Sequence, residues 1–126
     1  MKHLLPSLLL LFVILIFTLV NGMAISHLTE EWQVQITHAG TLAAQNRWED
    51  AFSAIEKSHR DWSSRQQYLH VVLKHDGIDR VQEMYHRAMA FAIARENAEF
   101  QAETAGLRAQ LAALAETEEF SLKNLL

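Results

Sequence analysis

The chain has 126 residues, of which 50% are hydrophobic, and it contains one proline, four glycines and no cysteine. A chain of this length forms one small domain. The absence of cysteine excludes a disulfide framework, a thiolate metal site and a cysteine nucleophile. Residues 26–126 have ten Lys and Arg against fifteen Asp and Glu. The bases are scattered among the acids, so we expect no nucleic-acid partner.

The first predicted element is an apolar helix that crosses a membrane. Residues 1–25 include 18 apolar residues, and no Asp, Glu, Lys or Arg occurs between His3 and Thr29. As a helix, the stretch from Leu4 to Ile25 would be about 33 Å long, which is enough for a hydrocarbon layer about 30 Å thick. We therefore predict a transmembrane anchor at residues 1–25.

The residues on either side of the anchor predict its orientation. Lys2 precedes it, whereas two glutamates follow it before the next base, Arg47. The excess of positive charge on the cytoplasmic side places the N-terminus in the cytoplasm and residues 26–126 outside. A signal peptide cleaved near Ala24, which would release a secreted domain, is the alternative. The length of the apolar run favours the anchor.

The remaining residues predict an all-α fold. Residues 26–126 contain no proline and sixteen alanines, and no stretch alternates as a strand does. Start signals place helices from about Thr29, after Asn46 as N-cap, after Gly77 and after Asn97. Because the connections are short, neighbouring helices should be antiparallel. We predict an N-terminal transmembrane helix followed by a small antiparallel bundle of about four helices.

Each predicted bundle helix has one apolar stripe that would be buried against the others. The stripe of the second helix alternates steps of four and three over almost four heptads. Its members are Trp48, Phe52, Ile55, His59, Trp62, Gln66, Leu69 and Leu73. The third helix offers Ile78, Val81, Tyr85, Ala88 and Ala92, and the fourth offers Phe100, Thr104, Leu107, Leu111 and Leu114. We interpret His59 and Gln66 as a buried polar pair that fixes the register, and a polar recognition site is the alternative.

One face of the third helix has residue types that bind metal ions. These candidate ligands are His75, Asp79, Glu83 and His86. Stacked on one helix they extend over about 16 Å, too far for a single ion. A solvated polar face is therefore the expected interpretation, with metal ligation as the alternative. No nucleophile and base pair is recognisable, so we expect neither an enzyme nor a cofactor.

An apolar tail at residues 120–126 follows an acidic turn at residues 116–119. A free apolar tail is unfavourable in water. We expect it to fold back on the bundle, and docking to a partner or to the membrane is the alternative.

The order of these features resembles a known family. The matching residues are Trp48, Ala51, Trp62, Leu69, His75, Ile78, Asp79, Ser121, Leu122 and Asn124. They resemble the pattern of the family called domain of unknown function (DUF) 4363, whose members are small, single-anchored bacterial membrane proteins. The resemblance implies no activity, cofactor or catalytic residue. It marks these positions as structural or interaction residues.

The function expected from the sequence is a membrane-tethered module that binds proteins outside the cytoplasm. The module would bind a partner protein, or it would bind a second copy of itself through the stripe of the second helix. The alternative is an extracytoplasmic domain that senses a ligand or a metal.

Overall fold

The computed structural model contains five α-helices and, within the residues that it describes, no β-strand. It describes the backbone of residues 3–125 and the side chains up to residue 116. The helices are α1 (Leu4–Ala44), α2 (Trp48–Ser64), α3 (Gln66–Val72), α4 (His75–Ala94) and α5 (Asn97–Leu125). The predicted all-α fold with one apolar N-terminal helix is confirmed.

Helix α1 joins the apolar segment and the first bundle helix into one element of 41 residues. The prediction of a separate helix beginning near Thr29 is wrong, because no proline lies in residues 20–30 and the backbone remains helical through Asn21 and Gly22. The side chains from Leu4 to Val20 are largely exposed, whereas Ile25 is fully buried. In the described part of the chain, α1 is the helix that is long and apolar enough to cross a membrane. It enters the bundle without a linker.

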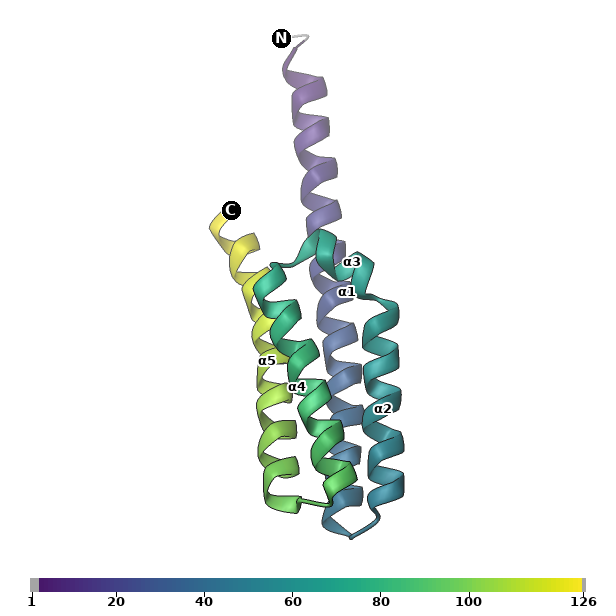
Figure 1. Cartoon of the computed structure of the whole chain (residues 1–126). Helices are drawn as coiled ribbons and strands as arrows, with labels where there is room; N and C mark the ends of the chain where they lie inside the picture. Colours follow the sequence, from purple (N-terminus) through teal and green to yellow (C-terminus); the bar gives the residue numbers. More distant parts are fainter. Residues whose placement is uncertain (1–2, 126) are drawn as a thin grey trace.

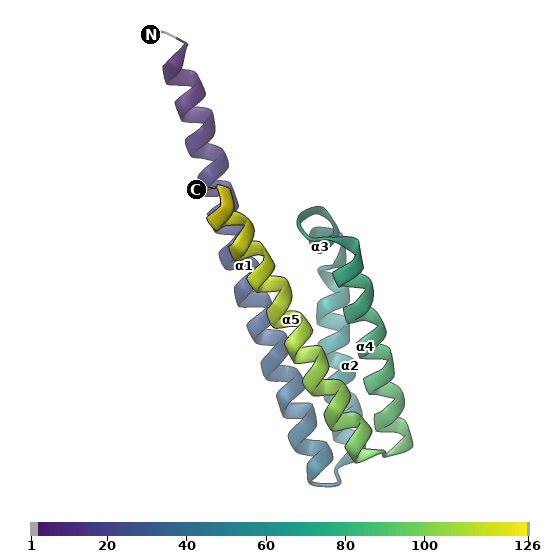
Figure 2. The ribbon, with the colours of Figure 1, turned by 90° about the vertical axis from the view of Figure 1, so that its left-hand side faces the viewer.

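Four helices form the bundle (Figure 1). The second half of α1 packs with α2, α4 and α5, in that ring order, and each helix runs antiparallel to its two neighbours. In Figure 2, α1 and α5 lie side by side in one layer, and α2 and α4 form the other layer. All three tryptophans, Trp32, Trp48 and Trp62, are in the core. The apolar half of α1 leaves the bundle at the end where α3 lies.

The predicted second helix is in fact two helices. Helix α2 ends at Ser64, and Arg65 separates it from α3. Ser64 Oγ donates a hydrogen bond of 2.7 Å to the carbonyl oxygen of Asp61. Such local bonds let serine compete with a continuing helix. Helix α4 then begins at His75, slightly before the start predicted after Gly77.

The apolar stripes follow the prediction in two helices and differ in one. In α4 and α5, all ten predicted stripe residues are buried. In α2 the predicted Trp48, Ile55 and Trp62 are buried. Two positions of the stripe differ, because Ala51 and Ser58 are buried while Phe52 and His59 are only half-buried. The small Ala51 and Ser58 side chains let the neighbouring helices approach α2 closely. Larger side chains at the same positions would hold them apart.

The ends of two helices also differ from the prediction. Asn46 has φ of 61° and does not cap α2, since the N-cap is Arg47. Asn46 Oδ1 instead accepts a 2.9 Å hydrogen bond from Trp48 Nε1. The backbone of α5 remains helical to Leu125, so the predicted acidic turn at residues 116–119 is wrong. The side chains of the apolar tail, residues 120–126, lie outside the described residues.

Candidate functional site

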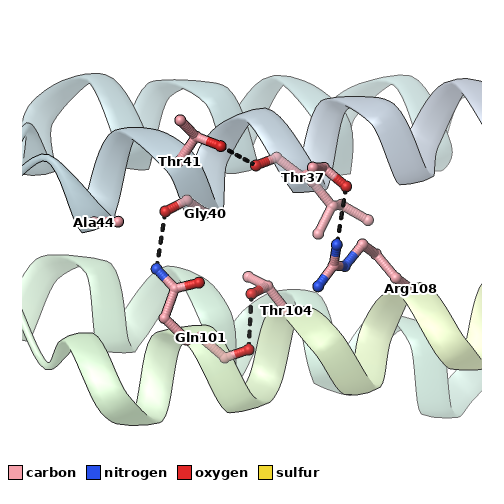
Figure 3. A pocket seen from close by; sticks show the side chains of 8 residues that line it. Thr37, Gly40, Thr41, Ala44, Gln101, Thr104 and Arg108 are labelled. Carbon is pink, nitrogen blue, oxygen red and sulfur yellow. Dashed lines mark hydrogen bonds between the residues drawn. The ribbon is translucent and has the colours of Figure 1, made fainter.

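A hollow with polar walls lies between α1 and α5, and we call it the α1–α5 groove. Its volume is about 230 Å³, and Figure 3 shows the side chains that line it. The lining residues are Ile36, Thr37, Gly40, Thr41, Ala44, Gln101, Thr104 and Arg108. Three hydroxyl groups, one amide and one guanidinium group therefore face a small space, and none of the lining residues is acidic.

Gly40 allows α5 to approach the backbone of α1 at the groove. Gln101 Nε2 donates a hydrogen bond of 2.8 Å to the carbonyl oxygen of Gly40 (Figure 3). A Cβ atom at position 40 would lie 3.2 Å from Gln101 Oε1, which is closer than nearly all real contacts of this kind. The glycine therefore lets a side chain from α5 bond directly to the main chain of α1.

Arg108 provides the positive charge of the groove. Its Nη1 donates a hydrogen bond of 3.1 Å to Thr37 Oγ1, across the space between the two helices (Figure 3). Its Nε is buried and has no hydrogen-bond partner in the described part of the protein. No carboxylate forms an ion pair with Arg108 among the described side chains. A guanidinium group with free donors suits a carboxylate or a phosphate, which it binds through two parallel hydrogen bonds.

No site was predicted here from the sequence, and of the lining residues only Thr104 was named, as a member of an apolar stripe. One signal was available, because Arg108 is the only base between residues 97 and 122 of an alanine-rich helix. The periodicity of a single helix identifies its apolar face. It does not identify one basic residue beside that face as part of a site. It also cannot detect a groove that needs two helices, whose bonded residues Gly40 and Gln101 are 61 positions apart.

A second polar group lies inside the bundle, between α1, α2 and α4. Ser58 Oγ and Tyr85 Oη share a buried hydrogen bond of 2.8 Å. Burial raises the pKa of Tyr85 well above its ordinary value, and the hydrogen bond from Ser58 opposes this change only in part. Gln35 Nε2 donates to Asp61 Oδ2 at 2.8 Å, which links α1 to α2. These bonds satisfy polar groups and fix how the helices align.

His59 lies beside this polar group, on the α4 side of α2. Its Nε2 lies 3.3 Å from Gln82 Oε1 on α4 and 3.4 Å from Ser63 Oγ on α2, so the predicted pairing with Gln66 is wrong. Its ring stacks on Trp62 and meets His86 edge to face. Burial lowers the pKa of His59, the hydrogen bond to Gln82 opposes this, and the nearby His86 lowers the pKa further.

A family model described as domain of unknown function (DUF4363) matches residues 20–125. The chain belongs to this family. No curated protein and no solved structure matches the chain. The description of DUF4363 names no reaction and no ligand.

In this DUF4363 protein, five of the seven positions that resembled the family pattern and have described side chains are core positions. Five of them are buried, namely Trp48, Ala51, Trp62, Leu69 and Ile78. His75 and Asp79 are exposed at the beginning of α4. The side chains of Ser121, Leu122 and Asn124 lie outside the described residues. The buried positions hold the bundle together and do not line the groove.

The four candidate metal ligands are not brought together in the DUF4363 bundle. His75 Nδ1 lies 2.8 Å from His70 Nδ1, Glu83 forms an ion pair with Arg87, and His86 accepts a hydrogen bond from Gln82. Asp79 is exposed. Among the described residues, no three His, Asp or Glu side chains lie close enough to hold one metal ion. The face therefore has the solvated and locally paired character of an ordinary helix surface.

Proposed function

We propose that this DUF4363 protein is a single-pass membrane protein whose bundle lies outside the cytoplasm. There it binds another protein through the α1–α5 groove, and it acts by binding and not by catalysis. Arg108 is the residue that would receive an acidic group of the partner.

The unbroken α1 supports the first part of this proposal. Its exposed apolar half has the length of a membrane span and passes directly into a buried bundle helix. In the sequence, Lys2 precedes the apolar segment, and Glu30 and Glu31 follow it. This charge distribution favours a cytoplasmic N-terminus.

The charge of Arg108, which has no carboxylate partner among the described side chains, is the observation that supports a binding role. A carboxylate of a partner would pair with this charge through the terminal nitrogens of the guanidinium group. In the stripe predicted for self-association, Trp48, Ile55, Trp62 and Leu69 are buried inside their own bundle, and the other four residues are half-buried. The groove is therefore the better candidate for contact with a partner.

Site-specific crosslinking in cells tests the binding role. A photoreactive residue replaces Thr41 at the groove, and the matched control replaces Arg80, which is exposed on α4 diagonally across the bundle. We expect an adduct from position 41 and none from position 80. The variant Arg108→Gln keeps much of the side-chain volume but removes the charge, so it should reduce the adduct several-fold. An adduct that does not change in Arg108→Gln would contradict the proposal.

The absence of native cysteines makes the orientation simple to test. The variant Ser53→Cys places one thiol at an exposed position of α2. A maleimide that cannot cross membranes should label it in intact cells. Labelling that occurs only after lysis would place the bundle in the cytoplasm. An N-terminal tag that is retained on the membrane-bound protein would distinguish the anchor from a cleaved signal peptide.

A further inference from the structure

Helix α3 forms the end of the bundle from which the apolar half of α1 leaves (Figure 1). Tyr68 Oη donates a hydrogen bond of 2.6 Å to Asn21 Oδ1, so α3 is held against the last residues of the apolar segment. Val71 on α3 is 85% exposed, which is more than any other large hydrophobic side chain among the described residues. Helix α3 therefore has an exposed apolar side chain, Val71, near the point where the apolar segment of α1 enters the bundle.

The length of the span determines where α3 lies relative to a bilayer. A hydrocarbon layer about 30 Å thick takes about 20 helical residues, so a span that begins at Leu4 ends near Met23. Ile25 is already fully buried in the bundle. No spacer separates the two, and Asn21 lies at the edge of the hydrocarbon. The headgroup region beyond that edge is roughly 5–8 Å thick, less than the diameter of a helix. A helix bonded to Asn21 therefore overlaps this region.

The side chains of α3 suit that position. Tyrosine is enriched at membrane interfaces because its ring is apolar and its hydroxyl is polar. Arg65 and Lys74 are exposed on either side of α3, and their long side chains can reach lipid phosphates. Asp76 is exposed at the same end, so the charges partly cancel. The main contribution to a contact with lipid therefore comes from burial of Val71 and not from net charge.

We propose that α3 docks on the surface of the membrane that α1 crosses, with Val71 inserted at the boundary between headgroups and acyl chains. The bundle is then fixed to the membrane at two points, the span and α3, which sets its rotation about α1. The lipid surface is the occupant because α1 brings α3 to it by direct chain continuity. This inference rests on the proposed membrane anchor.

Depth-dependent quenching on the full chain tests the docking. Three single-cysteine variants, Val71→Cys, Ile93→Cys and Ile14→Cys, are labelled with an environment-sensitive dye. They are reconstituted in phosphatidylcholine vesicles that contain nitroxide lipids, with the nitroxide near the headgroup for positions 71 and 93 and deep in the acyl chain for position 14, which lies about 15 Å from either end of the span. Ile93 is the matched control, because it is also a strongly exposed apolar residue, at 71%, but lies at the opposite end of the bundle. Ile14 reports on the span itself. Circular dichroism verifies that each labelled variant is folded.

We expect quenching at position 71 to be several-fold stronger than at position 93, with a blue-shifted emission at 71. Equal and weak quenching at positions 71 and 93, together with strong quenching at 14, would overturn the docking while leaving the anchor intact. Weak quenching at position 14 would overturn the anchor, and the docking with it. A further variant, Val71→Asp, removes the apolar side chain. It should leave the melting temperature of the bundle unchanged, but a spin label on α2 should then report greater rotational freedom of the bundle about α1.

Discussion

The two halves of α1 belong to one regular helix, yet their environments are opposite. Ile14 in the first half is 52% exposed, whereas Ile36 in the second half is fully buried. Both count equally toward the apolar content of the chain. Only the second half contributes to the core, where apolar side chains leave water on folding and so stabilise the bundle. The difference shows that the apolar content of the chain overstates the size of its core, because the apolar side chains of the first half of α1 do not pack in the bundle.

The largest expected effect compares the same substitution in the two halves. Ile36→Ala removes a buried side chain and should lower the free energy of unfolding by about 2–5 kcal/mol. Ile14→Ala should change it by less than about 0.5 kcal/mol, since that side chain does not contact the core. Denaturant unfolding of the full chain in detergent micelles, followed by the fluorescence of the three buried tryptophans, measures both. An equal decrease in the free energy of unfolding in both variants would contradict the distinction between the two halves of α1.

Two glycines sharpen the comparison. A Cβ atom at Gly77 would lie only 2.6 Å from Leu114 Cδ2, whereas at Gly22 it would meet nothing within 4 Å. Gly77→Ala should therefore destabilise the bundle by about 1–3 kcal/mol, because Leu114 is packed and must move. Gly22→Ala should not destabilise it, because alanine is the better helix former. Melting temperatures of the two variants provide the measurement. A loss of stability in Gly22→Ala would mean that the open half of α1 has contacts that the structure lacks.

A smaller effect is expected at the end of the bundle opposite to α3. Arg95 follows α4 with φ of 56°, in the left-handed region that glycine adopts most easily. Arg95→Gly should stabilise the bundle by about 0.5–1 kcal/mol by relieving this conformation. The control Ala94→Gly, one residue earlier in the regular helix, should have the opposite sign. Identical changes in both variants would show that the left-handed residue is not strained.

The smallest expected effect is a pH dependence confined to the packed region. Burial keeps the pKa of His59 below its ordinary value of 6.5, so the unfolded chain takes up a proton there before the folded chain does. The free energy of unfolding should therefore decrease as the pH falls below about 6.5, since His59 then favours the unfolded state. The control His59→Gln should show a weaker decrease between about pH 7.5 and about pH 5.5. An unchanged slope in that variant would assign the effect to other groups.

The sequence predicted those parts of the fold that depend on one helix at a time. The stripes of α4 and α5 follow a strict helical period, so their buried residues could be identified. Between Trp48 and Ile55, steps of four and three or of three and four are both compatible with a helix. The first order was predicted because Phe52 is more apolar than Ala51, whereas the structure has the second. The continuity of α1 was missed because a change of composition was interpreted as a boundary. A helix ends only where its backbone is interrupted, and nothing interrupts α1 near Thr29.

The α1–α5 groove could not be predicted in the same way. It depends on the approach of Gln101 to the carbonyl oxygen of Gly40 and of Arg108 to Thr37, and both pairs are far apart in the chain. Periodicity within a helix gives the direction of a face but not which residue it meets. The polar bond between Ser58 and Tyr85 was missed for the same reason.

Because α1 is unbroken, it fixes the distance between its apolar half and the α1–α5 groove. In a helix each residue adds about 1.5 Å, so Thr37 stands about 20 Å beyond a membrane span that ends near Met23. Since no joint lies between the two, this height is determined by residue count alone. Under the proposed function, a partner would have to present its acidic group at that height above the lipid. Adding one helical turn between the span and Ile25 would raise the groove by about 5 Å and separate it from a partner whose own height is fixed.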